Sequence, residues 1–444
     1  MPTPPPLDIA QILDRGNWTA YQRTLVLLTA LTIVFDGIDN QLIGVAVPTL
    51  MREWDVPRSA FAPVISAGYF GMMIGGALAG MAGDRFGRRV ALFGSTALFG
   101  VMTLVVAAVD DVHILAAVRF VTGIGLGGAM PNAAALAAEY VPSRQRPLAV
   151  TIAIVCVPLG ATLAGLVAIP LLPLFGWRTL FLIGGVLPLA AVVLLVRVLP
   201  ESPRFLARHP ERWRELTATL SRMGHDVPAD ATFADRQDAA AGARASIATL
   251  FQAAFLRDTV ALWGAFFSCL LAVYLGFSWV PSLLAGAGFS SSLASTGITA
   301  FNLGGVAGAL TGGYFIARVG SRRSMLVMAA LATIFAAVMS RMPLSPGADV
   351  LPILVMLTAT GAMINGVQTT MYALAAHVYP AAIRATGVGS AVSFGRIGAV
   401  LTGFVGAWAL EQGGSAMFFG VIAVAMAVCW VALAAVGRHV RPAD

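Results

Sequence analysis

Twelve stretches of about 20 mainly apolar residues, separated by short polar loops, dominate this chain. In lipid every backbone polar group must be paired within the protein, so runs of this length predict membrane-spanning helices. Only 11% of the 444 residues are charged, against about 25% in a typical soluble domain, which excludes a water-soluble globule. We therefore predict an all-α integral membrane protein, with transmembrane helices near residues 24–48, 61–82, 90–109, 113–139, 148–174, 179–198, 259–284, 292–316, 324–340, 350–376, 385–410 and 415–436.

One long polar stretch, 199–256, separates the first six apolar runs from the last six. It contains seven acidic residues and seven arginines, which is typical of a solvated segment, with short helices expected around 210–223. We predict an N-terminal six-helix bundle over 1–198, a cytoplasmic connector over 199–256 that acts as a solvated linker, and a C-terminal six-helix bundle over 257–444.

The arginines indicate the orientation of the chain. All 28 basic residues are Arg and the net charge is +7, but they are dispersed between the apolar runs, which argues against a nucleic-acid-binding patch. With twelve spans, the loops on one side carry 22 arginines and those on the other carry four: Arg52, Arg58, Arg178 and Arg341. By the positive-inside rule, both termini are predicted to be cytoplasmic. The Ala-rich, Lys-free composition favours a bacterial inner-membrane protein, and segment 1–21 has no signal-peptide pattern.

The two halves of the sequence repeat each other. The loop Gly80-Met-Ala-Gly-Asp-Arg-Phe-Gly-Arg-Arg89 recurs as Gly313-Tyr-Phe-Ile-Ala-Arg-Val-Gly-Ser-Arg322, 233 positions later. Residues 137–142 likewise match 375–380, at an offset of 238. Similar offsets at two loops predict two pseudo-symmetric six-helix bundles in parallel orientation.

The first of these loops resembles the signature loop of the major facilitator superfamily. Its glycines permit close helix approach, its Asp lies near helix N-termini, and its arginines can anchor to the cytoplasmic leaflet. The resemblance implies a conformational gate formed by Gly80, Asp84, Arg85, Gly87, Arg88 and Arg89, with Arg318 and Arg322 in the second copy. The second copy has Ala317 in place of the Asp, so we expect a weaker clasp there.

Further motifs are similar to those of the aromatic acid:proton symporters. They are Asp36-Gly-Ile-Asp39 in the first span, 119–132 through Glu139 in the fourth, Pro200–Phe205 (which sugar porters share), Gln368 through Pro380, Arg384–Gly387 and Gly395–Gly398. This resemblance implies the major facilitator fold and proton-coupled import of a small, hydroxybenzoate-like aromatic carboxylate by alternating access. The alternative function is proton-coupled export of drugs or another organic anion.

Charges inside the spans indicate where ions are handled, because a charge at mid-bilayer is costly without a partner or cavity. Asp36 and Asp39, with Asn40, share one helix face, and Arg119 enters its span to a similar depth. Two acids beside one Arg leave one carboxyl uncompensated, so we expect a proton-coupling cluster of Asp36, Asp39 and Arg119. A purely structural polar knot is the alternative.

Glu139 and His377 end the fourth and tenth spans at equivalent positions of the repeat. We expect gate contacts from His377 and from Arg384 nearby. Glu139 is kept as a proton-coupling candidate, with a gate contact as its alternative.

Arg396 lies near the middle of the eleventh span without an acid close by in that span. A buried guanidinium fits a carboxylate in bidentate fashion, so Arg396 is predicted to bind the substrate; capping by backbone carbonyls or Gln368 is the alternative. Other polar and aromatic residues are candidates for lining the same cavity. For the polar residues the alternative is interhelical hydrogen bonding, and for the aromatic residues it is plain packing. The candidates are Asn40, Gln368, Asn365, Asn132, Tyr372 and Phe301.

No motif supports an enzyme. Residues 123–128 read as GxGxxG, but they lie within a continuous apolar run without the strand and the distant acid of a dinucleotide site. Three widely spaced cysteines in apolar runs give neither a disulfide framework nor a metal site. We expect no metal, no cofactor besides the coupling proton, and a monomer whose partners are a small aromatic acid, protons and the lipid bilayer.

Overall fold

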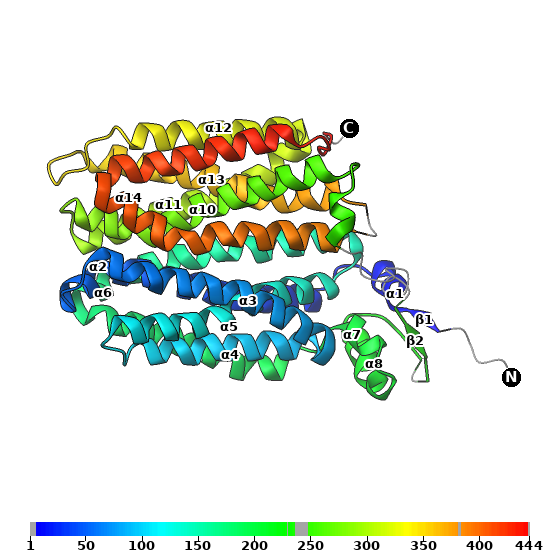
Figure 1. Cartoon of the computed structure of the whole chain (residues 1–444). Helices are drawn as coiled ribbons and strands as arrows, with labels where there is room; N and C mark the ends of the chain where they lie inside the picture. The colour runs from blue at the N-terminus through cyan, green and yellow to red at the C-terminus, as the bar shows by residue number, and fades with distance from the viewer. Residues whose placement is uncertain (1–5, 229, 236–246, 381–382, 443–444) are drawn as a thin grey trace.

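The computed structural model describes residues 6–228, 230–235, 247–380 and 383–442 (Figure 1). The long helices are α2 (Ala20–Glu53), α3 (Ala62–Phe86), α4 (Arg88–Val106), α5 (Val112–Glu139), α6 (Arg146–Val198), α10 (Leu256–Gly286), α11 (Ser291–Val319), α12 (Ser321–Met339), α13 (Val350–Val378) and α14 (Arg384–Ala435). The shorter elements are β1 (Leu7–Asp8), α1 (Ile9–Arg15), η1 (Arg58–Phe61), η2 (Ser143–Gln145), α7 (Pro203–Ala207), η3 (Pro210–Arg212), α8 (Trp213–Arg222), β2 (Phe233–Ala234) and η4 (Ile247–Phe251).

These ten long helices supply twelve spans because two of them are sharply kinked. Gly176 interrupts α6 with φ 74° and ψ 177°, and Gly414 interrupts α14 with φ 57° and ψ −141°. Each kinked helix is therefore a pair of spans joined without a loop. The predicted all-α, twelve-span membrane architecture is confirmed. The 123–128 glycine run lies inside α5, as helix packing requires.

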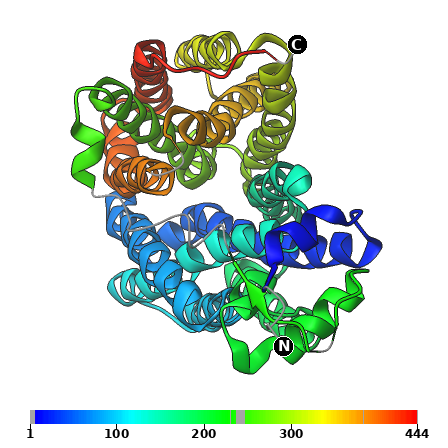
Figure 2. The same ribbon diagram turned by 90° about the vertical axis from the view of Figure 1, so that its right-hand side faces the viewer.

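The helices form two groups that repeat the same packing (Figures 1 and 2). In the N half (α2–α6), α2 packs on α6 and α3 on α5; in the C half (α10–α14), α10 packs on α14 and α11 on α13. These contacts join equivalent spans of the two sequence repeats. The internal duplication is therefore a repeated three-dimensional unit.

The described part of the connector contains short helices at 203–222, and those at 210–222 lie where the sequence predicts them. It lies with α1 and both chain termini at one end of the bundle, the connector end (Figure 1). β1 pairs in parallel with β2, and α1 buries Ile9 and Leu13 while α8 buries Leu216 and Leu220, all four at 0% exposure. The amphipathic α8 turns its apolar face inward, so this module has its own small core.

The two halves are joined at the opposite end, the far end. Arg58 Nη2 donates to the Ser282 carbonyl at 3.3 Å, and the Ser59 N–H donates to Glu411 Oε1 at 3.0 Å. Within the described ranges, no hydrogen bond joins the halves at the connector end. Among the described residues, the hydrogen bonds between the halves therefore lie at the far end and around the cavity.

Candidate functional site

An enclosed cavity lies between the two halves, about midway along the bundle. Its volume is about 50 Å³, well below the roughly 300 Å³ of small ligand pockets, so side chains must move to admit an organic acid. Its wall comes from both halves: Asp36, Asn40, Met72, Leu126, Met130, Ile154, Val157, Pro158, Leu270, Tyr274, Phe277, Asn365, Gln368, Thr369, Tyr372 and Arg396.

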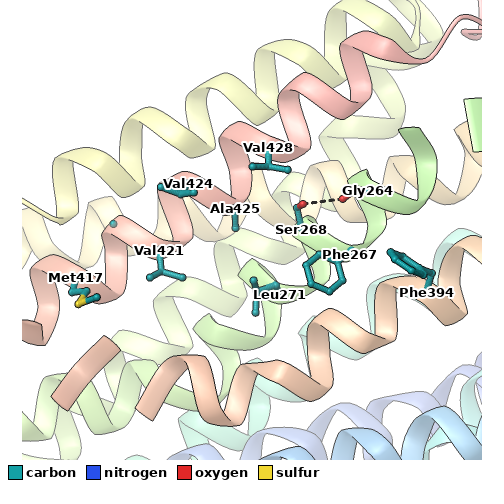
Figure 3. A pocket seen from close by; sticks show the side chains of 11 residues that line it. Gly264, Phe267, Ser268, Leu271, Phe394, Met417, Val421, Val424, Ala425 and Val428 are labelled. Atoms are coloured by element: carbon teal, nitrogen blue, oxygen red, sulfur yellow. Dashed lines mark hydrogen bonds between the residues drawn. The ribbon is translucent and has the colours of Figure 1, made fainter. Parts of the chain in front are cut away.

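A larger cavity of about 620 Å³ lies within the C half, between α10 and the two limbs of α14 (Figure 3). Phe267, Leu271 and Val421 point into it, and its one hydroxyl, on Ser268, is bonded to the Gly264 carbonyl at 2.8 Å. Val424 on its wall is 65% exposed at the apolar surface of the bundle. Such an apolar, lipid-facing crevice has no group that would recognise a charged substrate.

A buried ion pair stands in the N half, beside the enclosed cavity. Arg119 Nη1 of α5 lies 2.9 Å from Asp39 Oδ2 of α2, with side-chain exposures of 4% and 0%. Thr103 Oγ1 of α4 donates to the other carboxylate oxygen of Asp39. Three helices therefore hold one carboxylate. Sequence reasoning missed Thr103, which sits as an ordinary polar residue in an apolar run.

Asp36 lies one turn before Asp39 and has a different environment. It is 2% exposed and lines the cavity. Among the described residues it has no hydrogen-bond or ion-pair partner, although Asp39 and Arg396 are close enough to interact electrostatically. The two acids of the motif are therefore distinct: Asp39 is paired in the interior, and Asp36 is unpaired at the cavity.

Gly37 explains how this motif sits so deep in the bundle. A Cβ at this position would lie 2.2 Å from the Val157 carbonyl oxygen of α6. Only glycine lets α2 and α6 cross this closely at the level of the two acids. The close crossing brings Asp36 and Asn40 into the same cavity wall as Val157.

Arg396 reaches across from the C half to the N half. Its Nη1 donates to the Met72 carbonyl of α3 at 2.5 Å, so the alternative of capping by a backbone carbonyl is present in this conformation. Within the described chain this is its one recorded hydrogen bond, and a guanidinium has five N–H donors. Its position in the wall beside Gln368 and Tyr372 leaves donors for a ligand.

Four of the other predicted substrate residues line the same cavity: Asn40, Asn365, Gln368 and Tyr372. Asn365 already donates to the Gly361 carbonyl at 3.0 Å. The Asn40 side-chain nitrogen is buried without a partner within the described ranges. Tyr274 and Phe277 add two further aromatic rings to the wall beside Tyr372, and the ring centroid of Tyr274 lies 4.5 Å from that of Tyr69.

The structure does not bring Asn132 or Phe301 to the cavity. The Asn132 amide donates to the Ala79 carbonyl of α3 at 3.0 Å and accepts from Arg88 of α4 at 3.4 Å. Phe301 is 1% exposed and packs edge-on against Phe277, with ring centroids 6.1 Å apart. Asn132 therefore follows the alternative of interhelical hydrogen bonding, and Phe301 follows the alternative of plain packing.

Glu139 likewise does not join the Asp39–Arg119 pair. It ends α5, twenty residues or roughly 30 Å of helix beyond Arg119. Its Oε1 lies 4.0 Å from Arg88 Nε, and its other oxygen accepts from Ser202 Oγ. Arg88 also pairs with Asp84 at 2.5 Å. Glu139 thus belongs with Asp84 and Arg88 to a group of charged residues at the connector end, the connector-end cluster.

Glu201, in the connector, holds the beginning of α4. Its Oε1 accepts the backbone N–H groups of Arg89 at 3.0 Å and Ser202 at 2.9 Å. A Cβ on Gly87, whose φ is 105°, would lie 2.2 Å from Glu201 Oε2, so the signature-loop glycine makes room for this carboxylate. Burial raises the pKa of Glu201, and the two N–H groups act against that rise. The motif around Glu201 was noticed in the sequence, but this role was missed.

The remaining predicted gate residues contact their own half. The guanidinium carbon of Arg85 lies 5.3 Å from the ring centroid of Phe86. A Cβ built on Gly80 would have no atom of another described residue within 4 Å beyond its own helix turn. In the C half, Arg318 stacks on Tyr314 at 5.3 Å and Arg384 donates to the Tyr379 carbonyl at 3.3 Å. His377 and Arg322 are exposed. The two predicted clasps do not meet in this conformation.

At the far side of the cavity the halves are sealed by buried side-chain hydrogen bonds. Gln41 of α2 donates to the Phe277 carbonyl at 2.9 Å and accepts from Asn302 of α11 at 3.0 Å. Tyr69 and Ser278 share a hydrogen bond of 2.8 Å between α3 and α10. In the described chain no three His, Cys, Asp or Glu side chains gather as a metal site.

Known proteins resemble this chain over most of its length. The profile of the Major Facilitator Superfamily matches residues 29–345 and 262–444. The chain is 35% identical to a gallate transporter of Pseudomonas putida, covering 93% of this chain and 91% of that one. It is 36% identical to the 4-hydroxybenzoate transporter PcaK of Pseudomonas aeruginosa, covering 98% and 97%.

Solved structures show the same fold. The xylose transporter XylE of Escherichia coli, in a partially occluded inward-open conformation, superposes with a TM-score of 0.73 at 17% identity, covering 93% of this chain and 97% of that one. A D-xylose-proton symporter superposes with a TM-score of 0.72, also at 17% identity, covering the same shares of the two chains.

Proposed function

Because this chain belongs to the Major Facilitator Superfamily, we propose that it imports a small aromatic carboxylate, hydroxybenzoate-like, together with protons across a bacterial inner membrane. The observation that carries the proposal is the enclosed cavity, where the C half contributes a cation, Arg396, and the N half an unpaired acid, Asp36. The relatives named as gallate, 4-hydroxybenzoate and 3-(3-hydroxy-phenyl)propionate transporters support the substrate class.

Arg396 would bind the substrate carboxylate. Its guanidinium offers the planar pair of N–H groups that a carboxylate accepts in bidentate fashion. Tyr274 and Tyr372 in the same wall provide rings against which an aromatic acid can pack. A flat anion with one carboxylate fits this combination of one cation, two phenols and aliphatic side chains.

Asp36 would carry the coupling proton, while the Asp39–Arg119 ion pair would hold this part of α2 in place. An ionised Asp36 beside a substrate carboxylate on Arg396 would set two negative charges against one guanidinium. Protonating Asp36 removes that repulsion, so proton and substrate anion favour each other's binding. Asp39 is already compensated by Arg119 at 2.9 Å, which makes it the structural member of the motif.

Alternating access would break the hydrogen bonds between the halves at the far end and bring the halves together at the connector end. If the connector and both termini face the cytoplasm, as the arginine distribution predicts, this conformation is inward-facing. The connector-end cluster around Asp84, Arg88 and Glu139 would then meet the C half when the cavity opens outward. Since one chain contains the whole cavity, we infer that a monomer suffices, with the proton as the sole coupling partner.

The test is uptake of radiolabelled 4-hydroxybenzoate into proteoliposomes. An outside-acid pH gradient should drive accumulation above equilibrium, and a protonophore should abolish it. Ser268→Ala, in the lipid-facing crevice, should leave uptake unchanged, whereas Arg396→Ala should abolish it. Equilibration without accumulation, or extrusion towards the acidic compartment, would refute import and favour the exporter of drugs or another organic anion.

A further inference from the structure

Two polar side chains of α2 face the cavity without partners. Asp36 is 2% exposed and Asn40 is 4% exposed, and both line the cavity. Among the described residues the Asn40 amide nitrogen donates to no acceptor, and Asp36 has neither a hydrogen bond nor an ion pair. Buried polar groups are nearly always bonded, so an orphaned pair in a cavity wall points to a ligand.

The spacing of the pair defines the chemistry of that ligand. Residues four apart on a helix lie one above the other on the same face, with Cβ atoms about 5–6 Å apart. Asn40 offers N–H donors, and Asp36 offers an acceptor oxygen, which its carboxyl group keeps when it carries the coupling proton. A single hydroxyl group between them can accept from one and donate to the other, which neither a carboxylate nor an unsubstituted ring can do.

The C half supplies a group for the other end of the ligand. Arg396 belongs to the C half, whereas Asp36 and Asn40 belong to the N half. The same wall includes apolar side chains, among them Met72, Leu126, Leu270, Val157 and Pro158, which suit an apolar ring. A hydroxylated aromatic acid would therefore span the interface, with its carboxylate on one half and its hydroxyl on the other.

We propose that Asp36 and Asn40 together recognise a ring hydroxyl and so make this transporter selective for hydroxylated aromatic acids over the unsubstituted acid. The inference rests on the proposed function, because it takes Arg396 as the carboxylate site. A site built to bond a hydroxyl discriminates strongly against the analogue that lacks it, since its buried polar groups are then left unpaired.

The first test varies the ligand and leaves the protein unchanged. Equilibrium binding to the full chain in nanodiscs is compared for benzoate, 3-hydroxybenzoate, 4-hydroxybenzoate and their methoxy counterparts at one pH. At least one hydroxybenzoate should bind tenfold or more tightly than benzoate. Its methoxy counterpart, which accepts but cannot donate to Asp36, should lose most of that gain. Equal binding of benzoate and both hydroxybenzoates overturns the proposal.

The second test removes the Asn40 donor. Asn40→Ala, and Asn40→Leu as a second variant that keeps the volume, should weaken the preferred hydroxybenzoate at least tenfold while changing benzoate less than twofold. Ser268→Ala is the matched control and should change neither. Equal weakening of both ligands, or of neither, overturns the hydroxyl assignment. If benzoate still binds and depends on Arg396, the proposed function survives that failure; if no aromatic acid binds, the proposed function fails.

Discussion

Asp39 Oδ2 lies 2.9 Å from Arg119 Nη1 in an almost fully buried ion pair, while Asp36, three residues earlier, has no such partner among the residues that the structure describes. One short motif therefore contains two acids in different surroundings, one paired in the interior and one at the cavity wall. The difference arises from the helix face: Asp39 turns towards α4 and α5, where Thr103 and Arg119 reach it, and Asp36 turns towards the cavity.

Asp39→Asn should destabilise the protein. Removing one partner leaves the Arg119 guanidinium buried and uncompensated, which costs about 3–5 kcal/mol. Thermal unfolding followed by tryptophan fluorescence in detergent should show a clearly lower midpoint. Asp84→Asn, which removes an acid that is 42% exposed, is the control and should change the midpoint little. The double variant Asp39→Leu with Arg119→Met should recover much of the stability. A midpoint unchanged by Asp39→Asn would contradict the role of this pair.

Asp36→Asn should separate binding from proton coupling. No ion pair is lost, so the unfolding midpoint should stay close to that of the wild type. Exchange of labelled for unlabelled substrate across the vesicle membrane should persist, because the neutral amide resembles the protonated acid. Accumulation driven by a pH gradient should disappear. A variant that still accumulates substrate in response to the gradient would show that the proton is carried elsewhere.

Arg396→Lys keeps the charge but loses the planar fork. Bidentate binding of a carboxylate is then impossible, and we expect affinity for the aromatic acid to fall by about 10- to 100-fold, equivalent to about 1.4–2.7 kcal/mol. The lysine also lacks the guanidinium group through which Arg396 donates to the Met72 carbonyl. Isothermal titration with the purified chain measures the loss directly. An affinity within twofold of the wild type would remove Arg396 from the carboxylate site.

Gln41→Ala should weaken the seal between the halves at the far side of the cavity. The glutamine is 1% exposed and bonds both Phe277 and Asn302 of the C half, so its loss favours conformations open at the far end. A cysteine placed at Ser282, which is 2% exposed at that end, should react faster with a membrane-impermeant maleimide in the Gln41→Ala background, in a chain lacking its three native cysteines. An equal labelling rate in both backgrounds would argue that Gln41 is no part of the far-side gate.

The sequence could predict the spans, the repeat and most of the polar residues of the cavity wall, because each depends on local patterns. Apolar run length defines a span, and Asp36, Asn40, Gln368 and Arg396 stand out as polar residues in lipid. What it could not predict were partners brought together by tertiary packing. Thr103 is one of many hydroxyl residues in apolar helices, and nothing local shows that it meets Asp39. Asn132 and Phe301 were predicted to line the cavity because the sequence indicates which helix each residue belongs to. It does not indicate which face of that helix the residue occupies.

Glu201→Gln should change how stability depends on pH. Burial raises the pKa of Glu201 above its usual value near 4.5, so the folded state binds the Glu201 proton more tightly than the unfolded state does. Stability from this group is therefore fully present below the unfolded pKa and declines as the pH rises through the raised folded value. The glutamine variant cannot ionise and keeps an oxygen acceptor for the Arg89 N–H. Its unfolding midpoint should fall less than that of the wild type between pH 4 and pH 7, and parallel pH profiles for the two proteins would contradict the raised pKa.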